Sequence, residues 1–151
     1  MSHPTIVNAI AALTAISVSW PVVASKLKNF GRGEKYNRIL LVVYHDPKTK
    51  EDFALLHQDP EKFFMRSGER ADAVAGRLLQ EHLPTLCSAD VHYDYHHYRH
   101  KFVHESVEYR VVVFDTTFGV TPGKGDCVLL KNGFLFVPVE AHPLYDCFKE
   151  S

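Results

Sequence analysis

The sequence predicts a mixed α/β sandwich of the α+β type, built on a mixed sheet and preceded by one N-terminal apolar helix. Three observations predict it: two apolar runs read as strands, one internal amphipathic helix follows them, and further strand patterns come after that helix. Because the helices do not alternate with the strands, the order excludes a doubly wound parallel sheet. A chain of 151 residues has room for one such domain.

The two strands before the internal helix have different characters. Residues 38–45 (RILLVVYH) are nearly continuously apolar, which predicts a strand buried on both faces. A turn at residues 46–50 separates them from residues 52–57 (DFALLH), which we expect to pair antiparallel with the first strand. Asp59 and Pro60 end this second strand.

The internal helix is expected over residues 69–83, with capping residues before it and Pro84 after it. Two long strands, 91–103 and 107–114, follow around a tight turn. Later, Asn132-Gly133 lies between two apolar runs, 127–131 and 134–137, and this dipeptide favours a type I′ hairpin. A short helix after Glu140 is expected to close the chain.

The N-terminal segment, residues 4–25, carries no charged side chain. It is long enough for a membrane span, which takes roughly 20 apolar residues. Lysines and arginines follow it in a polar segment, residues 26–37, which we interpret as a linker. The positive-inside rule then places the main domain, residues 30–151, in the cytoplasm behind a single-pass anchor within residues 1–29.

Two other interpretations of this segment stay open. A helix buried in the fold would be equally apolar and would leave the protein in the cytoplasm. A cleaved signal peptide would also be apolar, although the basic stretch that begins such peptides is missing. Three cysteines, without any CxxC spacing, cannot all pair within one chain and favour free thiols in a reducing compartment. The net charge of -1 gives no basic face of the kind that DNA or RNA polymers require.

The internal helix resembles the signature of the Nudix hydrolases, G-x5-E-x7-R-E-U-x-E-E-x-G-U, in which U is aliphatic. Glu69 and Arg77 reproduce the E-x7-R spacing, and Leu79 and Glu81 match U and the first glutamate of the pair. The resemblance covers roughly residues 36–148 and implies a Nudix-like α/β/α sandwich. In that family the helix carboxylates hold the divalent cations of a diphosphate hydrolase.

Four positions depart from the signature: its two glycines fall at Phe63 and Pro84, and the other two departures fall on those carboxylates. Leu78 replaces the glutamate after the arginine, and His82 replaces the second glutamate of the pair. Positions 78, 81 and 82 share one helix face, where Mg²⁺ would require oxygen ligands. We therefore expect no catalytic residue here, no cofactor and no metal. The alternative is a divergent hydrolase that uses Mg²⁺, Glu69 and Glu81, with a further carboxylate from Asp94, Glu105 or Asp115.

Residues 91–104 (VHYDYHHYRHKFVH) form the most unusual pattern of the chain. If side chains alternate along a strand, one face mixes aromatic rings with cationic groups, as a pocket for a nucleotide-derived ligand does. The other face offers His92, Asp94 and His96 as metal ligands, and an ordinary solvated strand is the third interpretation. Lys124, in the glycine-containing loop 119–126, is added to the expected ligand-binding residues, since such loops either cradle phosphate or simply connect elements. These residues are Tyr93, Tyr95, His97, Arg99, Lys101 and Lys124.

Three functions follow as expectations. The first is a membrane-anchored sensor that binds a nucleotide-derived small molecule without hydrolysing it and signals to residues 4–25, with homo-oligomerisation as part of the response. This combination resembles the SMODS-associated Nudix type of bacterial anti-phage systems, which implies a cyclic oligonucleotide ligand. The second is the divergent Nudix hydrolase, cleaving a nucleoside diphosphate derivative with Mg²⁺. The third is a Nudix-fold scaffold without a ligand.

Overall fold

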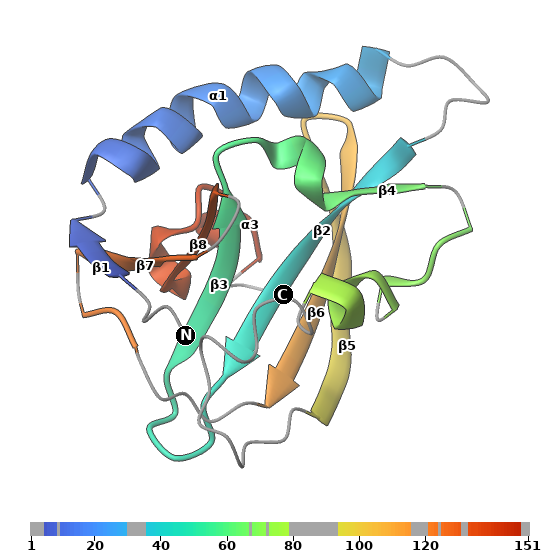
Figure 1. The fold of residues 1–151 in the computed structure, drawn as a ribbon. Helices are drawn as coiled ribbons and strands as arrows, with labels where there is room; N and C mark the ends of the chain where they lie inside the picture. Colours follow the sequence, from blue (N-terminus) through green and yellow to red (C-terminus); the bar gives the residue numbers. More distant parts are fainter. Residues whose placement is uncertain are drawn as a thin grey trace.

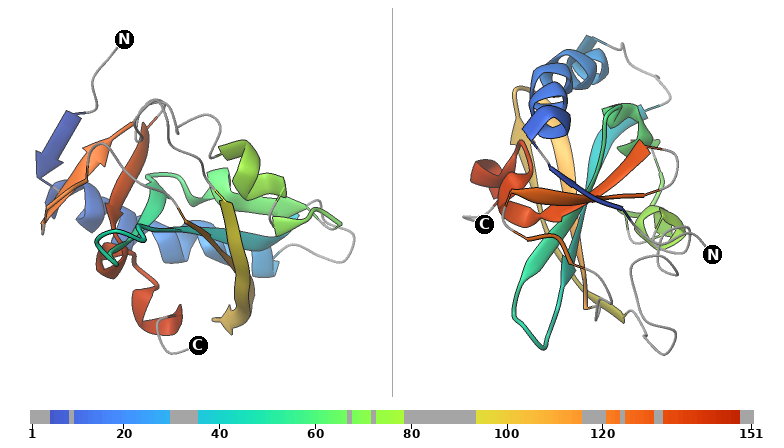
Figure 2. Two further views of the ribbon diagram at one scale, coloured as in Figure 1. Left: turned by 90° about the horizontal axis from the view of Figure 1, so that it is seen from below. Right: turned by 60° about the vertical axis from the view of Figure 1, so that its left-hand side comes forward.

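The computed structural model describes residues 5–8, 10–29, 36–66, 68–71, 73–78, 94–115, 121–123, 125–130 and 133–148. Helices cover both faces of one mixed sheet, so the α/β class expected from the sequence is confirmed (Figures 1 and 2). The strands are β1 (Thr5–Asn8), β2 (Tyr36–His45), β3 (Asp52–His57), β4 (Phe64–Arg66), β5 (Asp94–His104), β6 (Val107–Asp115), β7 (Asp126–Leu129) and β8 (Phe134–Pro138). The helices are α1 (Ile10–Asn29), η1 (Pro60–Phe63), η3 (Val139–Ala141) and α3 (Tyr145–Phe148).

A further helical segment lies at residues 71 and 73–78, and we call it the mid-chain helix. It is the unlabelled green helix of Figure 1. Figure 2 shows it on one face of the sheet, with α1 and α3 on the other. The expected helix over 69–83 is thus observed in this part, and residues 79–83 lie outside the described residues.

The sheet runs in the order β1-β7-β8-β3-β2-β6-β5, with β4 also paired to β2. Strand β2 lies near its centre and is buried from Ile39 to Tyr44, as its unbroken apolar run predicts. It pairs parallel with β6 and antiparallel with β3. Parallel strands need a long crossover connection, and the mid-chain helix lies in the one between β2 and β6.

Strand β2 is shared by two partners along one edge, so the sheet forks there. Its end, Val43–His45, pairs with β3, whereas its start pairs with β4 through Ile39 and Phe64. The side chain of Arg38 fixes the branch, because its Nη2 donates to the carbonyl oxygens of Arg66 at 2.7 Å and Glu69 at 2.9 Å. The fork therefore sets where the mid-chain helix begins.

The hairpins agree with the sequence pattern. Strands β5 and β6 meet in a two-residue turn, and β7 pairs antiparallel with β8. The register of β7 on β8 places Leu129 opposite Leu135, whereas a two-residue turn at 132–133 would place Leu129 opposite Phe136. The hairpin is therefore confirmed, but the expected type I′ turn is not, although Gly133 has a left-handed φ of 82°. The expected closing helix is α3. The sequence did not predict the short strands β1 and β4.

The N-terminal segment differs most from its expected structure. Residues Thr5–Asn8 form β1, an edge strand on β7, and α1 continues to Asn29, through the first part of the expected linker. Helix α1 packs on the sheet, with Ile16, Trp20 and Ala24 buried. These residues are four apart and share one helix face. Their apolar character is explained by the core that they enter, as the interpretation of a buried helix expects.

Residues 4–25, most of which lie in α1, were expected to span a membrane. In the part of the chain that the structure describes, no helix combines the length and the apolar character that a membrane span needs.

Candidate functional site

The mid-chain helix carries the signature positions of the Nudix resemblance. Its inward stripe consists of Ala71, Val74, Ala75 and Leu78, all buried in the main core. Leu78 is 7% exposed, so the position at which the signature has a metal-binding glutamate holds a core side chain. Arg77 is exposed. The remaining signature positions, Leu79, Glu81 and His82, lie outside the described residues.

Glu69, the other carboxylate of the hydrolase interpretation, has a local role. Its Oε1 accepts the backbone N–H of Arg66 at 2.7 Å, and its own N–H donates to the carbonyl of Arg66. This reciprocal pair closes the turn between β4 and the mid-chain helix, next to the Gly68 position at φ 87°. The carboxylate of Glu69 thus holds the helix entrance in place.

The further carboxylates of that interpretation lie at opposite ends of one hairpin. Asp94 and Asp115 are register partners at the open end of β5 and β6. Glu105 lies in the turn at the other end. Positions 94 and 115 are therefore opposite each other in the register, and Glu105 is too far along the strands to join them.

Strand β5 does not alternate regularly, as the expected ligand face assumed. Its register on β6 shifts between Tyr95 and His97, and again between Tyr98 and His100. Tyr95 is opposite Phe114 and His97 is opposite Val113, so these two positions face different sides of the sheet. Exposed Lys101, opposite Arg110, shares the face of Tyr95. Arg99 lies within β5, but only its backbone is described.

Two expected ligand residues, Tyr93 and Lys124, lie outside the described residues. The glycine-containing loop beside Lys124 forms a tight turn, in which the N–H of Asp126 donates to the carbonyl of Gly123 at 3.0 Å. His92 also lies outside the described residues. Among the residues that are described, no three histidine, cysteine or acidic side chains gather closely enough to hold a metal ion.

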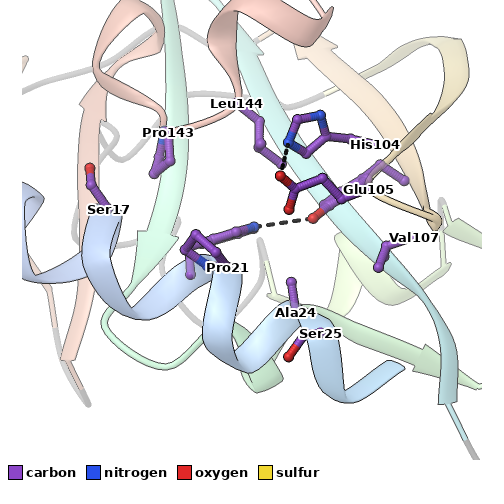
Figure 3. A pocket seen from close by; sticks show the side chains of 11 residues that line it. Ser17, Pro21, Ala24, Ser25, His104, Glu105, Val107, Pro143 and Leu144 are labelled. Atoms are coloured by element: carbon purple, nitrogen blue, oxygen red, sulfur yellow. Dashed lines mark hydrogen bonds and ion pairs between the residues drawn. The ribbon is translucent and has the colours of Figure 1, made fainter. Parts of the chain in front are cut away.

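A pocket of about 180 Å³ lies on the α1 side of the sheet (Figure 3). One helix face of α1 forms one wall, the β5–β6 turn forms the second, and Pro143 and Leu144 form the third. This pocket was not predicted from the sequence. Its signal was the four-residue spacing of Ile16, Trp20 and Ala24, which places these side chains on one helix face.

The polar groups at the pocket form two separate sets of contacts. The indole Nε1–H of Trp20 donates to the hydroxyl of Tyr109 at 3.2 Å in a buried hydrogen bond. Nδ1 of His104 lies 3.4 Å from Sγ of Cys147, and its Nε2 lies 4.0 Å from the carboxylate of Glu105. Figure 3 shows the imidazole of His104 beside the carboxylate of Glu105.

Cys147, His104 and Glu105 lie next to one another in that order, and they have the residue types of a nucleophile, a base and an orienting acid. The environment does not activate the thiol. Burial raises the pKa of Cys147, and the negative charges of Asp146 and Glu105 raise it further. Cysteine attacks as the thiolate, so a neutral Cys147 is unsuited to nucleophilic catalysis.

Burial also raises the pKa of Tyr109, although its hydrogen bond from Trp20 acts in the opposite direction. Tyr109 therefore remains a neutral phenol, which can donate one hydrogen bond while it accepts the one from Trp20. The pocket thus presents a hydroxyl donor, an imidazole and a carboxylate at one end of apolar walls.

Comparison with known proteins leaves the family open: no family model, no curated protein and no solved structure matches the chain.

Proposed function

We propose that the chain is a catalytically degenerate Nudix-like domain that binds a nucleotide-derived ligand without hydrolysing it. The observation that carries the proposal is Leu78. A leucine that is buried in the core on the mid-chain helix removes one of the carboxylates with which the Nudix family binds its cations. The helix has strands before it and after it in the chain, which is compatible with the proposal.

Restoring the glutamate would not by itself restore a cation site. A carboxylate at position 78 would lie among Ala71, Val74 and Ala75, where burial of a charge is costly unless it is paired. The second replaced position, His82, offers an imidazole, and Mg²⁺ prefers oxygen ligands. Both departures therefore oppose hydrolysis by the usual Nudix helix.

The ligand is proposed to bind along β5 and the loop that contains Lys124. The residues proposed to contact it remain Tyr93, Tyr95, His97, Arg99, Lys101 and Lys124. By the register of β5, positions 95 and 101 lie on one face of the sheet and position 97 lies on the other. Tyr95 is suited to stack on a base, and Lys101 is suited to pair with a phosphate of the same ligand.

Thermal unfolding in the presence of a cyclic dinucleotide, ADP-ribose or ATP tests ligand binding. A ligand that binds the folded state at a hundred times its Kd stabilises it by about 2.7 kcal/mol, which appears as a rise in Tm. Lys101→Glu should remove the rise, whereas Lys48→Glu, an equally exposed lysine in the β2–β3 turn, should leave it. No rise with any of these probes would contradict the proposal and favour a scaffold.

The hydrolase alternative is favoured by one observation, the register pairing of Asp94 with Asp115. Two carboxylates from outside the mid-chain helix are the ligands that a divergent Mg²⁺ site would need. In this alternative the chain releases phosphate or mononucleotide from nucleoside diphosphate derivatives when Mg²⁺ is added. Glu81→Gln and Asp115→Asn should each abolish the release, and Glu140→Gln should not. Turnover that persists in both Glu81→Gln and Asp115→Asn would contradict this alternative.

We propose further that the domain meets a membrane through the outward face of α1. Val18 is 70% exposed and Val22 is 66% exposed, one helix turn apart, on a segment without charged side chains. An apolar helix face lying in the lipid interface buries such side chains without crossing the bilayer. The full chain should sediment with phosphatidylglycerol/phosphatidylethanolamine vesicles, and Val18→Lys/Val22→Lys should stay in the supernatant. Equal sedimentation of both proteins would contradict the proposal.

A further inference from the structure

The turn between β5 and β6 has an unusual backbone beside the pocket at α1. Glu105 has φ 50° and Ser106 has φ 68°, so both central residues are left-handed, as a type I′ turn requires. Such turns favour Asn-Gly, because a left-handed conformation costs a residue with a Cβ atom roughly 1 kcal/mol or more. The chain contains that favourable pair at Asn132-Gly133, between β7 and β8. At the β5–β6 turn it instead places an acidic side chain in a strained position.

The strained turn holds Glu105 at the edge of the pocket. Its carboxylate lies 4.0 Å from Nε2 of His104. The other ring nitrogen of His104, Nδ1, lies 3.4 Å from Sγ of Cys147. Glu105 and Tyr109 are close enough for the carboxylate charge to help raise the pKa of the phenol. Backbone strain that persists at a pocket with such a polar end is typical of ligand-binding sites.

The size and the walls of the pocket restrict what it can hold. An apolar cavity of about 150 Å³ is enough for a benzene molecule, so 180 Å³ accommodates one ring with a short arm. The walls near Trp20 are apolar and include Pro21, Ala24, Val107 and Leu144. Of the described lining residues, Glu105 alone carries a formal charge at neutral pH if the histidine is neutral.

We propose that this pocket binds a compact ring-bearing primary amine in its ammonium form. The ring would lie against the apolar walls, and the ammonium would donate to the carboxylate of Glu105. This inference goes beyond the function proposed above and does not rest on it. A phosphate would be repelled by the same carboxylate, so the pocket is distinct from the nucleotide site proposed along β5.

Trp20 makes the proposal directly measurable, because it is the only tryptophan of the chain and lines the pocket. Its fluorescence should change saturably when the full chain is titrated with benzylamine, in the millimolar range expected for a ligand of about eight non-hydrogen atoms. Benzyl alcohol should bind more weakly, and benzoate should give no saturable change. A response to benzylamine that never saturates, or saturation by benzoate at the same concentrations, would overturn the proposal.

Glu105→Gln tests the role of the carboxylate, with Glu140→Gln, at an exposed position of η3, as the matched control. Because the side chain of Glu105 is 64% exposed, its pairing with the ammonium is partly screened, and we expect an affinity loss of about three- to fivefold. The control should bind benzylamine as the unmodified chain does. Equal affinity for Glu105→Gln and the unmodified chain would overturn the assignment.

A second variant guards against a mere loss of folding. Glu105→Asn/Ser106→Gly gives the turn its preferred residues and should raise the Tm while weakening benzylamine binding at least as much as Glu105→Gln does. A more stable protein with weaker binding would show that the strained turn serves the ligand. If this variant bound benzylamine as tightly as the unmodified chain, the strained turn would have no role in ligand binding and the proposal would be contradicted.

Discussion

Helix α1 and the mid-chain helix cover opposite faces of the same sheet, but their outward faces differ. The mid-chain helix exposes Arg77 and buries a four-residue apolar stripe, so its two faces are chemically distinct. Helix α1 buries Ile16, Trp20 and Ala24 and still exposes Val18 and Val22 on its outer side. One helix is amphipathic in the usual sense, and the other is uncharged on both faces along most of its length.

This difference explains why α1 was expected to cross a membrane. Average hydropathy over a segment counts the buried side chains and the exposed ones together. An apolar outer face added to an apolar inner face therefore raises the average hydropathy of the segment toward that of a membrane span. The distinction appears only in three dimensions, where Trp20 reaches Tyr109 on β6, 89 positions away in sequence.

The largest expected effect in this comparison comes from Trp20→Ala. Removing the indole leaves a cavity beneath α1 and breaks the hydrogen bond to Tyr109, so the free energy of unfolding should fall by about 3–5 kcal/mol. Urea unfolding followed by far-UV circular dichroism measures it. Val22→Ala on the outer face should change the value by less than about 0.5 kcal/mol. Small, equal effects of both substitutions would mean that α1 does not share the core of the sheet.

Leu78→Ala makes the corresponding test on the mid-chain helix. Leu78 is smaller than Trp20 and slightly more exposed, so we expect a loss of about 2–3 kcal/mol, near the lower end for buried leucines. Arg77→Ala, its exposed neighbour, should stay within about 0.5 kcal/mol of the unmodified chain. The same urea titration measures both variants. If Leu78→Ala were as harmless as Arg77→Ala, position 78 would face a solvent-filled site, and the argument against a cation site would fail.

Strong local patterns made most of the fold predictable. The apolar run at β2 and the bounds of β3 could be read from composition and turn residues alone. The missed strands are short: β1 and β4 have four and three residues, too few for a periodic pattern to appear. They form because neighbouring strands offer them an edge, β7 for the first and β2 for the second.

The candidate sites were harder to predict, for two physical reasons. The expected ligand face on β5 assumed that successive side chains alternate strictly between the two faces of the sheet. Two register shifts interrupt that alternation, and no glycine in β5 indicates them in the sequence. The pocket at α1 joins Trp20, Glu105 and Leu144, which are far apart in the sequence. Only the packing of α1 and the C-terminal segment against one sheet face brings these residues together. The resemblance of the mid-chain helix to the Nudix signature, by contrast, was a local pattern and could be read directly.

His142 makes the packing of α1 dependent on pH. It lies edge-on to Trp20 at 5.2 Å between ring centroids, and complete burial lowers its pKa to about 3. As pH falls, His142 is therefore protonated in the unfolded chain before it is protonated in the folded chain. The free energy of unfolding consequently decreases as pH falls from about 6.5 toward 3. Between pH 7 and pH 5 this group should cost about 1–2 kcal/mol.

The variant His142→Asn isolates this contribution. Asparagine offers an oxygen that can accept the N–H of Leu144, as Nδ1 of His142 does at 3.0 Å, but it does not titrate. The difference between the urea midpoints at pH 7 and pH 5 should be smaller in the variant than in the unmodified chain, while other histidines contribute equally to both. Parallel pH profiles would show that His142 is already solvated in the folded state.

The smallest expected effect is that of Val18→Lys/Val22→Lys on the outer face of α1. Both valines are about two thirds exposed or more, so replacing them removes little buried apolar area, and lysine is a good helix former. The free energy of unfolding should change by less than about 0.5 kcal/mol, by the same urea titration. A stable variant that no longer sediments with vesicles would separate the two faces of α1, one holding the fold and the other contacting the membrane. A loss of several kcal/mol would instead show that Val18 and Val22 are buried against protein, and that the contrast between the two helices is smaller than their exposure indicates.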